Sequence, residues 1–339
     1  MMTKQNKSAA VLFLIFAISF TGSAQVFDKY AGEFLSGGTG SRYLALGNNS
    51  VSFVDDAFSV YWNPAGLAST SYPQFVVMHN ERFSGLISYD FIAMSYPLSQ
   101  KSTVGLGVLR NSIDNIPYTV GGWNEIKNQK ETNFTPTYFN AAEYAFFGSI
   151  ASTEYFQLPI GISTKVLWRQ YGNVATAWGV GFDAGIQLKN VSDINDLSFG
   201  LTIHDFTSTY MSWSTGHTEL ISPSIESGIS YSFDFLFGRT LLAFGLINRF
   251  ENRQSSAQYH WGSISHDLKT GAEYSYNDKI GVRLGYNELK RLNAGVGLKV
   301  RAIWIDYAFE QFDGTESLGN SHRLSISFTL DKERFLRPQ

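Results

Sequence analysis

The sequence contains no cysteine, which excludes disulfide bonds and thiolate metal sites as stabilising elements of the fold. Charged residues are also scarce, at 16% of the chain, where an ordinary soluble protein carries about 25%. Past residue 25 there is no uninterrupted stretch of about 18 apolar residues, so a membrane-spanning helix is excluded there. The net charge of −3 provides no basic surface for nucleic acid or for anionic lipid.

Recognisable catalytic motifs are missing as well. The chain has no Gly-x-Ser-x-Gly, no Ser-x-x-Lys and no His-Glu-x-x-His. His204-Asp205 and His266-Asp267 place a base beside an acid, but both pairs fall at expected strand ends. A hydrolase site would also need a serine nucleophile, such as Ser230, within reach of one of these pairs. We therefore expect no enzyme activity, no cofactor and no metal site, with a barrel hydrolase as a minor alternative.

The first 24 residues have the three parts of a signal peptide. Lys4 and Lys7 form a positive region, Ala9–Phe20 is an apolar core, and Gly22-Ser-Ala24 is a small-residue cleavage site. The core is too short for a membrane span, which needs about 20 apolar residues. A retained helical anchor is therefore the weaker interpretation, and we expect an exported protein that begins at Gln25.

Alternating apolar and polar residues are what the chain has in abundance. At the end of the chain, His322 and Leu324 fall on one side of an extended strand, and Arg323 and Ser325 fall on the other. Fourteen segments share this period of two: Gln74–His79, Leu86–Tyr96, Ser102–Asn111, Phe139–Ala151, Pro159–Trp168, Thr176–Lys189, Leu197–Asp205, Ser224–Asp234, Arg239–Arg249, Asp267–Tyr276, Ile280–Asn287, Leu292–Val300, Ala302–Phe309 and His322–Leu330. An even count behind a secretory leader predicts an all-β fold, a 14-stranded antiparallel transmembrane β-barrel over residues 74–330.

The connections between these segments support the count. If the first strand runs outward, the connections after even-numbered strands lie in the periplasm and should be short turns, as Asn277–Lys279 and Arg301 are. Four of the opposite connections are long: Ser112–Tyr138, Phe206–Pro223, Phe250–His266 and Glu310–Ser321. This asymmetry is typical of outer-membrane barrels, whose extracellular loops exceed their periplasmic turns.

Charged residues gather on one face of the predicted strands. The set expected to face the lumen is Asp90, Glu143, Lys165, Asp183, Glu226, Glu273, Arg283, Lys299, Asp306 and Arg323. A basic residue on the lipid face at mid-membrane would cost about 2–4 kcal/mol, so this segregation is informative. The charges either form ion-pair ladders that hold the interior together, which we favour, or line a polar channel. The pairs Gly105/Gly107, Gly179/Gly181 and Gly295/Gly297 are interpreted as small inward residues that ease bending.

Residues 25–73 do not alternate, and we expect them to fill the lumen as an N-terminal plug. Adjacent residues point apart, so Asp55 and Asp56 are expected to cap a short helix or to pair with a lumen Arg or Lys rather than to form a catalytic or metal-binding pair. Asn63-Pro64-Ala65-Gly66 forms either a structural turn of the plug or part of a ligand or partner path. Residues 331–339 are expected to form a periplasmic tail.

Motifs at both ends of the mature chain resemble a known family. Arg42–Gly47, Asp55-Asp56 and Trp62–Leu67 are similar to the N-terminal signature of the PorV/PorQ family, which is related to the FadL-type fatty-acid channels. The ending is similar to that of the same family over three segments: Ala294–Lys299, Ile305–Phe309 and Leu318–Arg323. The resemblance implies a fourteen-stranded outer-membrane barrel with an N-terminal plug. The positions that match the plug motif are Asp55, Asp56, Asn63, Pro64, Ala65 and Gly66.

The resemblance implies two possible functions. PorV/PorQ proteins serve type IX secretion, where they bind the translocon or receive secreted cargo, whereas FadL-type relatives pass hydrophobic small molecules through the barrel wall. The favoured prediction is a non-enzymatic protein of a Gram-negative outer membrane that contacts lipid, translocon and cargo proteins. The alternative is a FadL-like channel for uptake or export of hydrophobic small molecules, with an apolar pocket against the plug and a lateral gap near a Gly-x-Gly pair.

Overall fold

The computed structural model describes residues 31–83, 85–124, 127–131, 133–154, 158–191, 196–311 and 320–330. The expected signal peptide and the expected tail at 331–339 lie outside these residues. Within the described ranges, no helix is both long and apolar enough to cross a bilayer.

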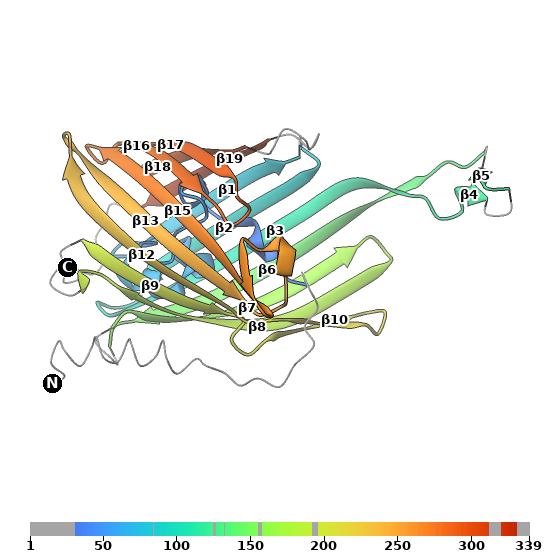
Figure 1. The fold of residues 1–339 in the computed structure, drawn as a ribbon, viewed down its shortest axis with the longest axis horizontal. Coiled ribbons are helices and arrows are strands. Elements are labelled where there is room, and N and C mark those ends of the chain that lie inside the picture. Colours follow the sequence, from blue (N-terminus) through green and yellow to red (C-terminus); the bar gives the residue numbers. More distant parts are fainter. Residues whose placement is uncertain are drawn as a thin grey trace.

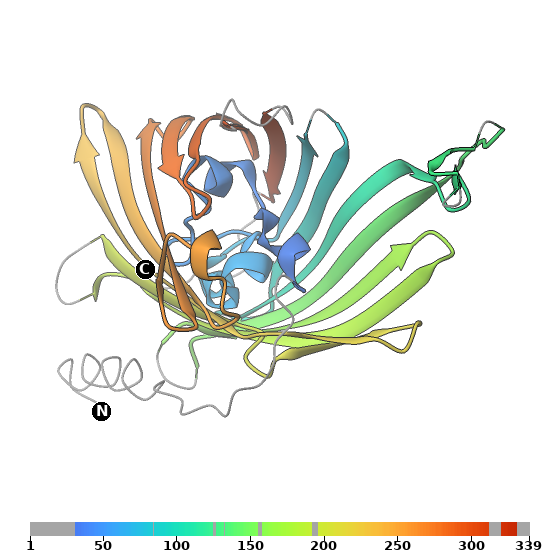
Figure 2. The same cartoon turned by 45° about the vertical axis from the view of Figure 1, so that its right-hand side comes forward.

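Antiparallel strands form one closed barrel in the described part of the chain (Figures 1 and 2). Its fourteen wall strands are β1 (Gln74–Arg82), β2 (Ile87–Pro97), β3 (Ser102–Tyr118), β6 (Thr137–Ser152), β7 (Ile160–Tyr171), β8 (Ala175–Leu188), β9 (Leu197–His204), β12 (Ser224–Phe235), β13 (Gly238–Arg249), β15 (Ile264–Tyr276), β16 (Ile280–Tyr286), β17 (Leu292–Val300), β18 (Ile303–Glu310) and β19 (Ser321–Thr329). The first and last strands pair along their length, with Val77 opposite Ile326, and this pairing closes the ring. The predicted fold class is confirmed, and each expected segment overlaps one wall strand.

Connections at the two ends of the barrel differ in size, as expected. At the short-turn end, β12 and β13 are joined by two residues, and Phe235 pairs with Gly238. The long-loop end carries additional short elements that the sequence did not predict: β4 (Trp123–Asn124), β5 (Gln129–Lys130), β10 (Thr209–Trp213), β11 (Thr218–Ile221), η4 (Gln254–Ser256) and β14 (Tyr259–Trp261). There β3 and β6 continue past the other strands as a long hairpin with β4 and β5 at its tip (Figure 1).

Side chains alternate across the wall in the predicted sense in most strands. In β18, Ile305 and Tyr307 are 41% and 38% exposed on the outside, whereas Asp306 and Ala308 are buried inside. The outer surface is therefore apolar, which suits contact with lipid. Polar and charged side chains on the inside need hydrogen-bond partners from neighbouring strands or from the segment that fills the lumen.

The N-terminal segment, residues 31–73, runs through the interior of the barrel (Figure 2). It contains η1 (Glu33–Gly37), α2 (Ser41–Ala45), α3 (Ser59–Trp62) and η2 (Pro64–Ser69). Helix α2 contacts β16 to β19, while η2 contacts β3 and β6 to β8, so the segment bridges separate parts of the wall. These elements are short, and α2 and α3 have no side-chain cap, so tertiary packing must stabilise them rather than helix propensity.

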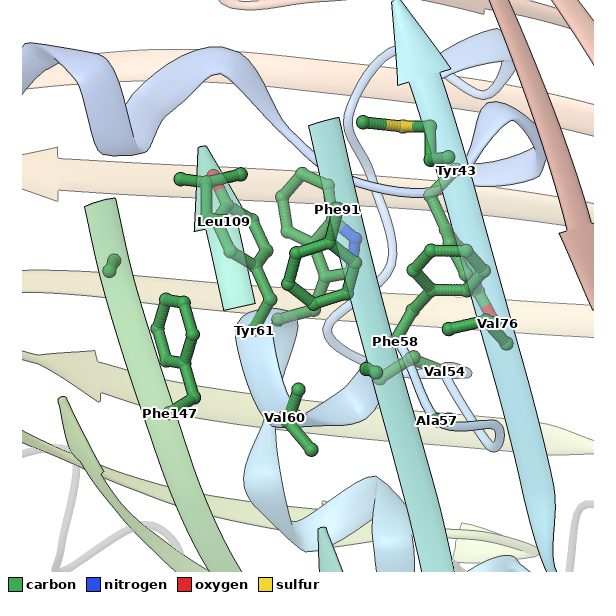
Figure 3. Close-up of a cluster of buried hydrophobic side chains, with 14 of the residues drawn as sticks. Tyr43, Val54, Ala57, Phe58, Val60, Tyr61, Val76, Phe91, Leu109 and Phe147 are labelled. Carbon is green, nitrogen blue, oxygen red and sulfur yellow. The ribbon is translucent and has the colours of Figure 1, made fainter. Parts of the chain in front are cut away.

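Aromatic side chains of the segment pack on the inner face of β2 and β6 (Figure 3). Phe58 stacks on Phe91 with ring centroids 5.7 Å apart, and Tyr61 meets Phe147 edge-on at 6.0 Å. All four side chains are buried. Full burial of one such side chain stabilises the fold by about 1.5–3 kcal/mol, so this cluster is the main apolar attachment of the segment.

Inward glycines allow the backbone of the segment to approach the wall. A Cβ at Gly161 of β7 would collide with the backbone of Pro64 and Ala65, and one at Gly285 of β16 would collide with the backbone of Gly47. The inward Gly105 and Gly107 similarly make room for Val60. Close approach of the segment thus accounts for these glycines, in addition to the bending expected from the sequence.

Candidate functional site

The Asn-Pro-Ala-Gly motif forms a capped turn against the wall. The Asn63 side-chain oxygen accepts a hydrogen bond from the Ala65 N–H at 3.1 Å, and Pro64 occupies the first helical position of η2. The Asn63 amide donates to the Val51 carbonyl at 2.9 Å and to the Ile186 carbonyl of β8 at 3.1 Å. All these motif residues are buried. The geometry therefore agrees with the structural interpretation of the motif.

The adjacent acids point in different directions and make different contacts. Asp55 is exposed and lies 3.6 Å from Lys189. Asp56 accepts hydrogen bonds from the Tyr43 hydroxyl at 2.7 Å and from the Phe58 N–H at 2.9 Å, just ahead of α3. Burial, together with the negative charge of Asp55, raises the pKa of Asp56 to about 7. This pair therefore has the contacts of capping and pairing groups, not of a shared ligand site.

Most of the charges expected in the lumen lie on the inner face, and these are Glu143, Lys165, Asp183, Glu226, Glu273, Arg283, Asp306 and Arg323. They are cross-linked in ion-pair networks. In one network, Arg42 of the segment donates to Glu273, which also pairs with Arg283, and Arg283 contacts Asp306 at 2.6 Å. Because Arg42 belongs to the segment, the network ties it to the wall through charge-assisted hydrogen bonds.

A second network crosses the wall strands from β7 to β15. Lys165 lies 2.8 Å from Asp183 and 2.9 Å from Asp205, and all three side chains are buried. On β12 and β15, Glu226 and Lys269 form a buried pair at 2.5 Å. His204 bridges the two groups, 3.7 Å from Asp183 and 4.0 Å from Glu226. Removing one member of such a network would leave an unpaired buried charge, which is strongly unfavourable.

Asp90 corrects the predicted lumen set. Its neighbours Tyr89 and Phe91 are fully buried and point inward, so Asp90 lies on the outer face, where it contacts His79 at 2.6 Å and Arg110 at 3.2 Å. The expectation that Asp90 faces the lumen is wrong because the N-terminal segment makes this part of the interior apolar. The apolar inner positions of β2 are therefore Tyr89 and Phe91, while Ile92 and Met94 keep the rest of its outer face apolar.

Lys299 occupies an inward position of β17 but lies exposed at the short-turn end. Its ammonium group is 5.8 Å from the centre of the Trp304 ring. It therefore does not take part in the buried networks described above.

A cavity of about 110 Å³ lies between the N-terminal segment and the wall toward the long-loop end. The segment contributes aromatic side chains to its lining, including Tyr61 and Trp62, and the wall contributes Lys165, Asp183 and Glu226. An apolar pocket was expected at this position. The cavity is instead rich in charge, because the inward positions of the neighbouring strands carry the ionisable residues of the second network.

The wall strand beside this cavity changes its pairing partner. Residues Ala184–Leu188 of β8 pair with β9, while Ala177–Val180 pair with β10. Over Gly181–Asp183 neither β9 nor β10 pairs in register with β8. Here the Phe182 carbonyl accepts a hydrogen bond from the Phe206 N–H at 3.0 Å. We call residues 181–183 and 204–209 the branch of the wall. Because Lys165, Asp183, His204 and Asp205 all line the cavity, it lies directly behind the branch.

Solved structures of two toluene transporters and a FadL homologue share this architecture. The Pseudomonas putida toluene transporter TodX matches with a TM-score of 0.59 at 13% identity, covering 90% of this chain and 99% of that one. The Ralstonia pickettii toluene transporter TbuX matches with a TM-score of 0.55 at 14% identity, covering 86% and 98%. A Pseudomonas aeruginosa FadL homologue gives 0.53 at 11% identity, covering 86% and 98%. This chain has their fold.

At these identities the likeness concerns the fold. No protein-family model matches the sequence, and no curated protein matches it. The FadL-type part of the resemblance is therefore confirmed at the level of the fold. Membership of the PorV/PorQ family and a role in type IX secretion gain no support from the comparisons and stay predictions.

Several residues of the cavity were not singled out by the sequence. Lys269 and Arg249 lie at inward positions of β15 and β13, so a stricter application of the period-two pattern would have found them. Glu288 lies in the connection after β16, and Trp62 lies in the N-terminal segment. Neither position has a periodic signal, and only the tertiary structure brings the two residues to one cavity.

Proposed function

We propose that the protein is a non-enzymatic outer-membrane channel for small molecules with a hydrophobic part. The observation that carries this proposal is the cavity directly behind the branch of β8, inside a barrel with the fold of toluene transporters and a FadL homologue. The N-terminal segment acts as a plug, and the cavity lies between it and the wall. A molecule that enters this cavity from the long-loop end would lie between the plug and the branch of the wall.

The proposal assigns the two ends of the barrel. The long loops face the cell exterior and the short turns face the periplasm, following the usual asymmetry of outer-membrane barrels. The amino-terminal leader exports the chain of a Gram-negative bacterium, and the apolar exterior of the barrel contacts outer-membrane lipid. Beside the branch, β8 presents Trp178, Val180 and Phe182 on its outer side, so a molecule that passed the wall would meet an apolar surface.

The lateral route depends on movement at the branch, and a disulfide can test this. Phe182 and Phe206 contact each other across the branch, with ring centroids 6.2 Å apart. The double variant F182C/F206C would join β8 to the connection after β9, and the absence of native cysteine leaves only the engineered bond. We expect oxidation to abolish most of the toluene entry that exceeds the entry into protein-free vesicles, and reduction to restore it.

A matched control places the same bond in a continuous part of the wall. Ile92 and Val108 are register partners on β2 and β3, so I92C/V108C should leave entry unchanged when oxidised. Equal toluene entry for oxidised and reduced F182C/F206C would rule out the lateral route. A lack of toluene entry above that of protein-free vesicles, with wild-type protein, would contradict the channel function itself.

A second candidate, protein contact in type IX secretion, is favoured by the end motifs and by the hairpin of β3 and β6. This hairpin extends well beyond the barrel (Figure 1) and exposes Tyr118, Trp123 and Tyr138. Exposed aromatic side chains are enriched at protein interfaces. A deletion of the hairpin tip that removes co-purification of translocon or cargo proteins, and leaves toluene entry intact, would support it. Unchanged secretion in a strain without the protein would contradict it.

A further inference from the structure

The turn between β12 and β13 exposes three large apolar side chains. It lies at the short-turn end of the barrel, away from the long hairpin of β3 and β6 (Figure 1). Phe235 is 53% exposed, Leu236 is 66% exposed and Phe237 is 90% exposed. A two-residue hairpin turn is usually built from small polar residues such as Asn-Gly. The apolar composition of this turn therefore needs a separate explanation.

The backbone of the turn is unfavourable for the residues that occupy it. Leu236 has a φ of 44° and Phe237 a φ of 66°, in the left-handed region that bulky residues rarely adopt. Most other non-glycine positions with positive φ in the described ranges carry asparagine or aspartate, as in the turn Asn277-Asp278 after β15. Strain of this kind persists mainly at positions where it serves a function. Strain and exposure thus point to the same two side chains.

The neighbouring strand β15 holds the turn in place. The Tyr274 hydroxyl donates a hydrogen bond to the Leu236 carbonyl at 2.6 Å. Gly238 lies so close to β15 that a Cβ on it would collide with the Ser275 carbonyl oxygen. The side chains of Leu236 and Phe237 are therefore presented on a fixed backbone, which lowers the entropy cost of binding a partner.

An open groove of about 520 Å³ lies between this turn and the turn at Asn277 and Asp278. Its volume is in the range of protein ligand sites, so it can accept side chains of a partner. Of the charged residues that line it, Arg239 pairs with Asp196, whereas Asp234 and Asp278 form no ion pair with any described residue. The groove therefore has an excess of negative charge beside the apolar turn.

This combination of apolar and acidic groups determines which partner fits. Lipid is disfavoured, because the exposed carboxylates of Asp234 and Asp278 would be costly to remove from water. A second copy of the chain is disfavoured as well, because two acidic grooves would face each other. A water-soluble protein with an apolar pocket between lysine or arginine side chains complements both properties. Aromatic side chains that fill such pockets provide much of the affinity of protein interfaces.

We propose that the turn of Phe235, Leu236 and Phe237 is the docking site for a soluble periplasmic protein. Phe237 is the aromatic anchor, and basic side chains of the partner occupy the groove. This inference goes beyond the channel function and uses only the orientation given above, in which the short turns face the periplasm. Transport through the barrel and docking on the turn can therefore be tested separately.

The experiment is photo-cross-linking in the bacterium that produces the protein, with p-benzoylphenylalanine in place of Phe235 in the full chain. Irradiation should join the protein to one soluble exported protein, which mass spectrometry of the product identifies. The test variant L236N/F237G carries the favoured residues of a two-residue turn. The identified protein, once purified, should bind the wild type in detergent micelles and bind L236N/F237G about tenfold more weakly, as for the loss of an aromatic anchor.

Two further variants test the position and the charge of the site. R301N/A302G makes the same change in the turn between β17 and β18, outside the groove, so it should bind the partner as the wild type does. D234N/D278N removes the two unpaired carboxylates and should weaken binding. Equal affinity of D234N/D278N and wild type would contradict the basic character assigned to the partner.

Cross-linking only to lipid or to a second copy of the chain, or no cross-linked product, would overturn the proposal. Equal affinity of L236N/F237G and wild type for the partner would overturn it as well. Relief of strain should raise the urea midpoint of L236N/F237G, so weaker binding cannot be ascribed to misfolding, and a lower midpoint would contradict the strain described above. Toluene entry into vesicles should be the same for L236N/F237G and wild type, so failure of the channel is distinguished from failure of the docking site.

Discussion

Single side chains fix the N-terminal segment inside the barrel, and Asn63 shows how. Its side-chain N–H donates a hydrogen bond to the Ile186 carbonyl of the wall, and its side-chain oxygen accepts one from the Ala65 N–H at the start of η2. Asp56 performs a related task for α3 by accepting the Phe58 N–H. Both residues belong to the motif that resembles the PorV/PorQ signature. Their contacts provide a structural reason for that pattern that does not depend on a ligand.

Replacing Asn63 with alanine should destabilise the folded protein. N63A would leave the Val51 and Ile186 carbonyls and the Ala65 N–H without their partner, at a cost of about 1–3 kcal/mol. Urea unfolding in detergent micelles would measure the change in the free energy of unfolding. Q129A at the exposed hairpin tip serves as the control and should have no effect. Equal stability of N63A and wild type would show that these hydrogen bonds are not needed.

The raised pKa of Asp56 gives the stability a defined dependence on pH. The folded state holds this proton up to about pH 7, while the unfolded chain releases it near pH 4, so folding is favoured most below pH 4. The contribution of Asp56 decreases as the pH rises from about 4 to about 7 and is constant above that. D56N has no such proton to lose. Between pH 5 and pH 8 the free energy of unfolding of the wild type should therefore fall by about 1 kcal/mol relative to that of D56N. Urea unfolding at each pH would measure this difference. A wild-type value that rises relative to that of D56N over this range would contradict the raised pKa.

At the scale of elements, small wall residues decide how closely the segment approaches. η2 lies against β7 and β8 only because Gly161 and Gly185 present no side chain there. The helices of the segment are single turns with little stability of their own. The fit between segment and wall therefore depends on both partners, and either can be changed.

Valine at position 161 should displace η2 from the wall. The new side chain of G161V would occupy the space of the Pro64 and Ala65 backbone, which cannot move without shifting the turn. We expect a larger ionic conductance in planar lipid bilayers, because the plug no longer closes the lumen. G148V is the matched control: this glycine faces outward from β6, where a Cβ would meet only Leu106 at 4.0 Å. Identical conductance of G161V and G148V would show that η2 does not limit the passage.

For the whole molecule, the exterior decides where the protein resides. Large apolar side chains are exposed all around the wall, as Leu106, Phe244 and Val282 illustrate. Such a surface is unfavourable in water and favourable in lipid. The interior carries the charges in pairs. This distribution is the reverse of that in a soluble protein.

We therefore expect the protein to remain with the membrane fraction under high-salt and alkaline washes, and to require detergent for extraction. A closed barrel of this kind should also resist unfolding by cold sodium dodecyl sulfate and should change its gel mobility on boiling. Fractionation and gel mobility of the same sample provide the measurement. Recovery of the folded protein in the aqueous fraction without detergent would contradict the barrel exterior described here.

The period of two in the sequence determined the number of wall strands, their order and, in most of them, the inward face. That information is local, because lipid outside and polar side chains inside act on every strand separately. β2 departs from the pattern around Asp90 for a reason that is not local, because a segment distant in sequence buries the inward side chains of Tyr89 and Phe91. The inner side of a strand follows the sequence pattern only where the lumen itself is polar.

Only the tertiary structure brings together residues that no sequence periodicity connects. Glu288, Trp62 and Lys269 come from a loop, the N-terminal segment and a wall strand, and they meet because the segment bridges the lumen. The change of partner along β8 depends in the same way on the connection after β9, whose strand β10 pairs with β8 where β9 no longer does. Alternation along a chain encodes which side of a strand faces lipid, but a cavity depends on distances between segments, and those distances are set by packing.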